Sequence, residues 1–248
     1  MRLESVLERT NGLPRYPARF PAMQRKALYD VIYARRDIRA QFLPDPIQPE
    51  MLRRVLDAAH HAGSVGFMQP WNFLVITDRQ LREQIWNSFQ KENRKAEQKF
   101  SGARRKLYRG LKLEGILESP ANICITCDRD RHGPQVLGRN SMRSTDLYST
   151  CCAIQNLWLA ARAEGLGVGW VSILNPRAVK RILRIPPKHQ LVAYLCIGHV
   201  REFPPAPDLE RAGWLKRLPL SSVTFSEQWG HPLPDNDNAD RKTKAGDK

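Results

Sequence analysis

Long apolar runs are missing from this sequence of 248 residues, in which no stretch of 18 or more apolar residues occurs. A helix needs about 20 such residues to cross a bilayer, so their absence excludes a membrane-spanning helix. The N-terminal residues MRLESVLERTNG also lack the apolar core of a secretory signal. We therefore expect a cytoplasmic protein that does not bind membranes.

Cysteine pairs at metal-binding spacing are also scarce. The chain has five cysteines, and Cys124 and Cys127 form a C-x-x-C within NICITCD, a run typical of a strand. Residues three apart on a strand point to opposite faces, and no second pair stands at zinc-ribbon spacing, so we expect no metal or redox site. Cys151, Cys152 and Cys196 are expected to be small core residues.

Negative charge is in short supply. Lys and Arg number 40 against 25 Asp and Glu, a formal net charge of +15, which attracts polyanions. A basic nucleic-acid-binding protein without catalysis is therefore an alternative. The basic residues are scattered among acidic ones, however, and no helix-turn-helix or zinc-finger spacing occurs. The composition favours a small ligand that carries a phosphate, and we expect no nucleic-acid partner.

The chain is expected to have three parts. Residues 1–22 are polar, basic and interrupted by proline, and they predict an N-terminal arm. Residues 23–230 are expected to form one domain. Residues 231–248 have few apolar side chains, and they predict a disordered tail.

The domain alternates helical and strand patterns without a strict βαβ order. Residues 145–164 form the most apolar helical pattern, apolar nearly all round, which places this helix in the middle of a fold. Asn175 and Pro176 predict the start of a short helix. The pattern indicates an α+β fold in which a mixed β-sheet packs around a central apolar helix. The expected helices and strands cover, by number, 24–36, 49–59, 72–77, two helices within 79–118, 121–127, 145–164, 168–173 and 190–200.

Three arginines stand within five residues at the end of the first helix, as Arg35-Arg36-Asp37-Ile38-Arg39. Guanidinium groups at this density suit a phosphate dianion, although a solvated basic turn gives the same pattern. Asp37 among them is a candidate acceptor or base, because neighbouring arginines favour its charged form.

A second candidate is the loop GSVGFMQPWN at residues 63–72. Its glycines allow a close approach of backbone to a ligand, and its polar groups alternate with large flat side chains. This mixture suits an aromatic heterocycle with amide-like edges. An ordinary connection between a helix and a strand is the alternative.

A third candidate is GLGVGWVS, which ends at Ser172. A dinucleotide fingerprint must follow a strand and open a helix, and here the order is reversed, so a Rossmann site is excluded. The Ser172 hydroxyl ends an apolar strand and needs a partner. A buried serine bonded to backbone is the alternative reading.

Taken in chain order, the three segments resemble the FMN-dependent nitroreductases, over roughly Ala27 to Leu220. Within that superfamily the chain resembles the flavin-cleaving branch, the 5,6-dimethylbenzimidazole synthases of cobalamin biosynthesis. The segments that carry this narrower resemblance are RRDIRAQFLPDP, SVGFMQPWNF, LKLEGI, ICITCDR, DLYSTCCAIQNLWLAARAEGLGVGWVSI and GWLKRLPL. Asp37 and Phe67 stand where ordinary nitroreductases have Ser and usually Asn, and both differences agree with the flavin-cleaving branch.

The resemblance implies a set of flavin contacts. It assigns the phosphate and ribityl chain to three arginines with a further basic contact, and the isoalloxazine ring to the loop, a lid segment and a strand end. The residues so implied are Arg35, Arg36, Arg39, Arg217, Ser64, Gly66, Met68, Gln69, Leu113 and Val171.

The resemblance also implies a reaction, in which reduced FMN and oxygen give 5,6-dimethylbenzimidazole and erythrose 4-phosphate, so that FMN is a substrate. Asp37 is the expected general base, and Ser172 is expected to hold an oxygen at the reactive edge of the flavin. An intertwined homodimer and a separate flavin reductase are expected. The alternative within the same fold is an NAD(P)H-dependent nitroreductase or flavin reductase.

Overall fold

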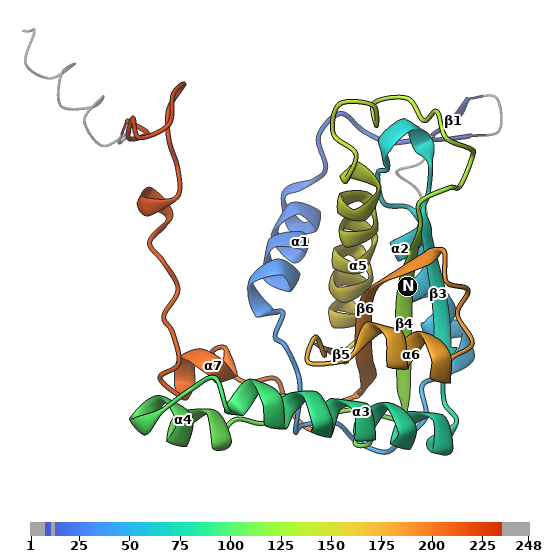
Figure 1. The fold of residues 1–248 in the computed structure, drawn as a ribbon. Helices are drawn as coiled ribbons and strands as arrows, with labels where there is room; N and C mark the ends of the chain where they lie inside the picture. Colours follow the sequence, from blue (N-terminus) through green and yellow to red (C-terminus); the bar gives the residue numbers. More distant parts are fainter. Residues whose placement is uncertain (1–7, 11–12, 235–248) are drawn as a thin grey trace, which may run out of the picture. The chain divides into compact units, whose positions relative to one another are not determined.

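The computed structural model describes residues 8–10 and 13–234 (Figure 1). The described residues divide into a unit that ends at Pro207 and a unit that begins at Asp208. The second unit contains α7 (Asp208–Arg211) and the 3-10 turn η2 (Leu220–Ser222). The first contains β1 (Glu8–Thr10), β2 (Leu13–Arg15), α1 (Ala22–Ala34), α2 (Pro49–His60), the 3-10 turn η1 (Val65–Phe67), β3 (Trp71–Ile76), α3 (Arg79–Glu97), α4 (Gly102–Arg109), β4 (Ala121–Asp128), α5 (Thr145–Ala163), β5 (Leu166–Trp170), α6 (Pro176–Ile182) and β6 (His189–His199).

The predicted division of the chain at residues 22 and 230 stays a prediction. Residues 1–7, 11–12 and 235–248, which include most of the predicted tail, lie outside the described residues. None of the described helices is long and apolar enough to cross a membrane.

A four-stranded antiparallel sheet organises the first unit. Its strand order is β3-β4-β6-β5, and β1 pairs with β2 in a separate two-stranded sheet. An isolated parallel bridge joins Asp37 to Val168 at the free edge of β5. The four strands themselves pair antiparallel, so this bridge is the parallel part of the predicted mixed sheet. The predicted α+β class is confirmed.

The central helix predicted at 145–164 is present as α5. Figure 1 shows α5 between the sheet and α1. Side chains on one face of α5 pack into a core with α2 and the sheet, as the spacing of the apolar residues requires. The buried apolar residues of α5 are Ala153, Ile154, Leu157, Trp158 and Ala161.

The other face of α5 corrects one expectation. Cys151 and Cys152, predicted to be core residues, are exposed. They share their face of the helix with exposed Tyr148 and Gln155, at positions i, i+3, i+4 and i+7. The cause is that, within the described residues, α2, the sheet and α1 cover other parts of α5, so an all-round apolar helix leaves this stripe uncovered. Cys196 lies in the core as predicted.

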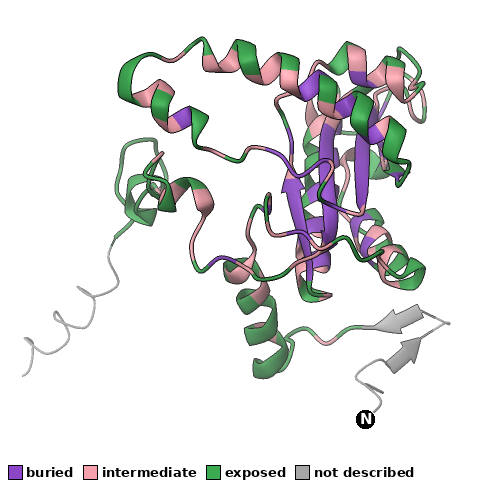
Figure 2. Ribbon diagram, turned by 90° about the horizontal axis from the view of Figure 1, so that it is seen from below, coloured by how far each residue is buried: buried purple, intermediate pink, exposed green. Residues whose placement is uncertain are grey.

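A second core covers the opposite face of the sheet. It contains Ile85 and Phe89 from α3, Val179 from α6, and Cys124 and Tyr194 from the strands. Asn175 begins α6 as predicted, because its Oδ1 accepts the Ala178 N–H at 3.1 Å. Figure 2 shows buried residues concentrated in the strands, whereas α1 has no buried residue.

Gly167 and Gly169 lie inside β5 and Gly165 just before it, so the strand begins at residue 166 and not at 168 as predicted. Ile38 donates its N–H to the Val168 carbonyl at 3.0 Å. A Cβ at Gly169 would collide with the Ile38 carbonyl oxygen, and one at Gly167 would lie 3.0 Å from Ile38 Cγ1. The glycines therefore allow the Asp37–Ile38 backbone to lie against β5.

Candidate functional site

The predicted phosphate-binding segment lies across the C-terminal half of α5. The guanidinium carbon of Arg35 is 4.7 Å from the centre of the Trp158 ring, a cation–π contact. Trp158 Nε1 donates to the Arg36 carbonyl at 3.2 Å, and Arg162 Nε donates to the Ala34 carbonyl at 3.3 Å. Helix α5 thus fixes the backbone of this segment. Because Arg35 turns to an extended conformation with ψ 134°, α1 ends at Ala34 and not at Arg36.

Arg36 is largely occupied by backbone carbonyls. Its Nε donates to Pro204 at 3.0 Å and its Nη2 to Pro205 at 2.7 Å. Its Nη1 donates to the Tyr33 and Arg35 carbonyls at 2.7 and 2.8 Å. A guanidinium has about five N–H groups, so little of this one remains for a ligand. Arg36 ties the end of α1 to the 204–205 segment.

Asp37 and Arg39 form a short ion pair at the end of β5. Arg39 Nη2 donates to Asp37 Oδ2 and to the Trp170 carbonyl, both at 2.5 Å. Asp37 Oδ1 accepts the Trp170 N–H at 3.0 Å. The Asp37 side chain is 44% exposed and that of Arg39 12%. Arg39 Nη1 is buried, and no acceptor for it exists among the described residues.

The strand end predicted to lie beside the flavin, Val171 and Ser172, comes directly after Trp170 in the chain. Val171 is buried and donates its N–H to the Tyr194 carbonyl at 2.9 Å. Ser172 comes just after β5 and is exposed, which rules out the alternative of a buried serine. Ser172 thus lies two residues from Trp170, which contacts Asp37.

The predicted lid segment packs beside the same residues. A Cβ at Gly115 would lie 2.7 Å from the Arg39 carbonyl oxygen, so the segment contacts the arginine backbone closely. Glu114 is buried and accepts the Ile116 N–H at 2.8 Å and the Lys112 ammonium at 2.6 Å. Leu113 is partly buried against the second core. Arg39, Val171 and Leu113 therefore lie in one region.

The predicted ring-binding loop lies at the other end of α5. Its Val65 N–H donates to Ser149 Oγ at 3.0 Å, and its Ser64 Oγ accepts the Gln69 N–H at 3.0 Å. Met68 is fully buried and anchors the loop. The loop tip is Phe67, which is 79% exposed and has φ +54°.

Two residues that the sequence pattern did not identify hold this loop. Arg131 donates to backbone and side-chain oxygens of residues 69–72, and Asp146 anchors the segment that carries Arg131. The residues that accept hydrogen bonds from Arg131 lie between 59 and 62 positions earlier in the chain. The only local signal is an acidic residue in the first turn of an apolar helix, which also fits an ordinary helix start.

Within one chain, the arginine segment and the ring-binding loop lie apart from each other. The arginine segment contacts Trp158 and the ring-binding loop contacts Ser149, nine residues earlier on α5. At 1.5 Å per residue, these contact points are about 14 Å apart along the helix. Arg217 is exposed and belongs to the second unit.

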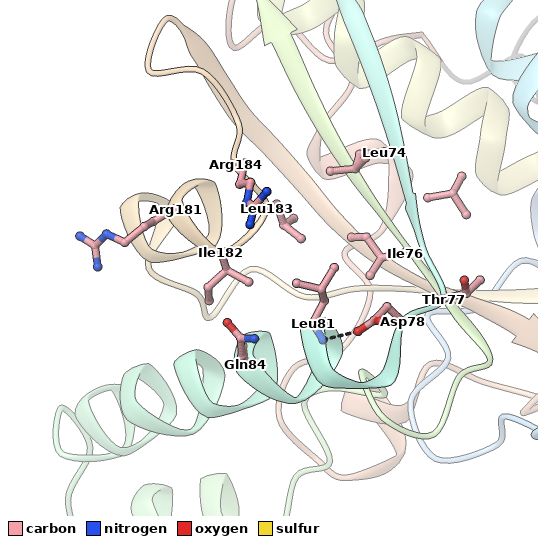
Figure 3. Close-up of a pocket in the computed structure, with 11 residues that line it drawn as sticks. Leu74, Ile76, Thr77, Asp78, Leu81, Gln84, Arg181, Ile182, Leu183 and Arg184 are labelled. Carbon is pink, nitrogen blue, oxygen red and sulfur yellow. Dashed lines mark hydrogen bonds between the residues drawn. The ribbon is translucent and has the colours of Figure 1, made fainter.

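A sizeable cavity lies elsewhere. It has a volume of about 730 Å³, and its lining comes from β3, the start of α3 and the end of α6 (Figure 3). Figure 3 shows Leu74 and Ile76 from the strand facing Ile182 and Leu183, with the Asp78 side chain accepting the Leu81 N–H. The lining includes no predicted site residue.

Burial favours the thiol form of two core cysteines. Burial raises the pKa of both Cys124 and Cys196 to about 12, so each stays a thiol at neutral pH. Cys127 contacts Thr150 of α5 whereas Cys124 packs in the second core, which confirms that the C-x-x-C pair faces both sides of the sheet. The described residues contain no group of side chains suited to a metal ion.

The fold and these segments match a known family. The sequence pattern of the nitroreductase family matches residues 32–199. The structure is similar to iodotyrosine deiodinase bound to FMN and 3-iodo-L-tyrosine, with a TM-score of 0.61, 22% identity, and 72% and 92% of the two chains covered. It is equally similar to the NADPH:FMN oxidoreductase of Vibrio harveyi, with a TM-score of 0.61, 21% identity, and 88% and 85% covered. The chain belongs to the nitroreductase family.

Closer relatives narrow this assignment. The chain is 45% identical to 5,6-dimethylbenzimidazole synthase of Rhodospirillum rubrum over 185 residues, which are 75% of this chain and 87% of that protein. It is 40% identical to the 5,6-dimethylbenzimidazole synthase of Rhodobacter capsulatus over 200 residues, 81% and 96% of the two chains. The narrower resemblance predicted from the motifs is confirmed.

Proposed function

We propose that this protein makes 5,6-dimethylbenzimidazole, the lower ligand of cobalamin, by fragmenting reduced FMN with molecular oxygen. Erythrose 4-phosphate is the proposed second product. The observation that carries this proposal is the 45% identity to a 5,6-dimethylbenzimidazole synthase over most of both chains. The site supports it, because Asp37 and Ser172 lie at one end of β5 beside the arginine segment.

The residues of the arginine segment fit an anionic ligand. Arg39 Nη1 is buried and lacks an acceptor among the described residues, and a ligand oxygen would supply one. Arg35, Arg36 and Arg39 carry the positive charge that a phosphate requires. Because Arg36 contacts mainly carbonyls, we assign it the task of holding the segment in place, and assign direct phosphate contact to Arg35 and to Arg217.

Asp37 is the proposed general base for the ribityl hydroxyls. Both of its oxygens accept hydrogen bonds, from Trp170 and from Arg39, so its orientation is fixed before the substrate binds. Its exposure of 44% leaves room for a substrate proton to reach it. The phosphate contacts are remote from the bond to be broken, and their binding energy positions the ribityl carbon beside this carboxylate. Ser172, exposed after β5, is proposed to hold oxygen at the reactive edge of the flavin.

A homodimer would complete the site. The arginine segment and the ring-binding loop contact α5 about 14 Å apart, so a second copy is needed to bring a loop to each arginine segment. Exposed aromatic and apolar residues of α1 and the α5 stripe offer the surface for it. These are Met23, Leu28, Tyr29, Tyr33, Tyr148, Cys151 and Cys152.

The proposed dimer predicts protected cysteines. In the native protein, Cys151 and Cys152 are expected to react with an alkylating reagent about as slowly as buried Cys196, although the single chain exposes them. Sedimentation should give twice the chain mass of 28.5 kDa. Denatured protein, in which all the cysteines react, is the control. Rapid labelling of both residues in a particle of single-chain mass would contradict the dimer.

Product analysis tests the proposed function. The purified protein is mixed with chemically reduced FMN in air, and the products are separated and identified by mass spectrometry. We expect 5,6-dimethylbenzimidazole. Reoxidised FMN as the sole flavin product would reject the proposal.

A further inference from the structure

The ring-binding loop adopts a conformation that its own residues do not favour. Phe67 and Gln69 have φ values of +54° and +48°, in the left-handed region that non-glycine residues rarely adopt. Gly66 precedes them with φ +51°. Such a conformation persists only where surrounding structure imposes it.

Arg131 supplies the contacts that impose this conformation. Its Nη1 donates to the carbonyls of Gln69 at 2.6 Å and Trp71 at 3.2 Å. Its Nη2 donates to Asn72 Oδ1, and the Asp128 N–H donates to the Pro70 carbonyl at 2.7 Å. One guanidinium therefore binds three acceptors across the end of the loop, a geometry that the fork of arginine allows and lysine does not.

Asp146 holds the segment that carries Arg131. Asp146 is fully buried in the first turn of α5, and its Oδ2 forms ion pairs with Nε of Arg129 and Nε of Arg139, each at 3.0 Å. Arg139 Nη1 donates in turn to the Arg129 carbonyl at 2.7 Å. A carboxylate at a helix N-terminus is stabilised by the helix dipole. The ion pairs thus fix both sides of Arg131 to α5.

The segment that carries Arg131 also contacts the loop at Gly66. A Cβ at Gly66 would lie 2.7 Å from the Leu137 carbonyl oxygen and 2.8 Å from Val136 Cγ1. The loop is therefore held between Arg131 at its end and residues 136–137 at Gly66. Phe67 stands between these two contacts and is 79% exposed.

We infer that Arg131 is a positioning residue for the isoalloxazine half of the site, acting through the loop that presents Phe67. The inference rests on the proposed function, which makes this loop a flavin contact. Arg131 contacts the loop and, through Nε, the Asp128 carboxylate at 3.9 Å, and among the described residues it contacts none of the predicted phosphate-binding arginines. It therefore controls how the ring is oriented and not how the phosphate is bound. A misplaced ring in a catalytic site lowers product formation even when the substrate is bound.

The test compares Arg131→Ala with Arg131→Lys and with the control Arg143→Ala. Arg143 lies in the same segment and carries the same charge, but within the described residues its side chain makes no hydrogen bond or ion pair. Hydrogen exchange of residues 65–72 is measured without flavin. We expect exchange at least about tenfold faster in Arg131→Ala, an intermediate change in Arg131→Lys, and no change in Arg143→Ala.

The second readout uses saturating reduced FMN. In Arg131→Ala, dimethylbenzimidazole formed per bound flavin should fall at least about tenfold, with hydrogen peroxide formed instead and with the preference for FMN over riboflavin retained. The visible circular dichroism of the bound ring should also change. Unchanged loop exchange, or an unchanged ring spectrum with normal yield, would overturn the inference. Altered exchange and ring spectrum would support it even if the wild-type protein formed no dimethylbenzimidazole, so the two failures are distinct.

Discussion

Asp37→Asn is expected to reduce dimethylbenzimidazole formation at least about a hundredfold while flavin binding survives. General bases contribute about 10²–10⁴-fold to a rate, and Asn has no proton-accepting carboxylate. The amide oxygen of Asn can still accept the Trp170 N–H. The bond to Arg39 is lost, which leaves the arginine charge available to the substrate.

The measurement pairs product yield with affinity for reduced FMN. Asp57→Asn is a matched control, because Asp57 is exposed on α2 and lies outside the site. Near-normal yield in Asp37→Asn would show that Asp37 only positions Arg39 and β5. Loss of flavin binding together with yield would contradict the expectation that binding survives, and the role of a base would then have no support, because occupancy alone would explain the lost yield.

Ser172→Gly is the companion variant. Ser172 follows β5 and its hydroxyl is exposed, so its removal should leave the fold and flavin binding unchanged. Oxygen consumption is expected to continue, with the product shifting towards hydrogen peroxide. An unchanged ratio of dimethylbenzimidazole to peroxide would mean that this hydroxyl does not handle oxygen.

A preference for FMN over riboflavin of at least about a hundredfold is the second large effect expected. Each charge-assisted contact contributes about 1.5–3 kcal/mol, and about 1.4 kcal/mol corresponds to a factor of ten in affinity. Riboflavin lacks the phosphate, so it loses every contact of this kind. Isothermal titration with both flavins measures the ratio.

Two variants identify the residues behind this preference. Arg35→Ala should reduce the ratio about tenfold or more, whereas Arg53→Ala, an exposed arginine of α2, should not change it. Arg36→Ala should instead lower the melting temperature, because Arg36 binds the Pro204 and Pro205 carbonyls. Equal affinities of the wild-type protein for the two flavins would reject the phosphate assignment.

The elements that the sequence predicted well are those with local causes. Helix α5 follows from apolar periodicity, the start of α6 follows from Asn175 and Pro176, and the two charged helices around residues 98–101 are present as α3 and α4. In each, neighbours in the chain determine the backbone. The motifs of the predicted site likewise fall on a helix end, a loop and a strand end.

What the sequence could not predict depends on partners far along the chain. Gly167 was predicted to precede the strand, but it lies within β5, where Ile38, some 130 residues earlier, packs against it. The exposure of Cys151 depends on how many neighbours α5 has, which periodicity does not give. Arg131 looks like part of a solvated turn until its contacts with residues 69–72 are known.

The most direct measurement of the central claim is the fate of reduced FMN in air, compared with that of oxidised FMN supplied with NADPH. In the first reaction we predict 5,6-dimethylbenzimidazole and erythrose 4-phosphate in equal amounts, identified by mass spectrometry. In the second we predict little product and little NADPH oxidation until a separate flavin reductase is added. Rapid NADPH oxidation by the protein alone, with FMN recovered intact in both reactions, would contradict the account and favour a nitroreductase.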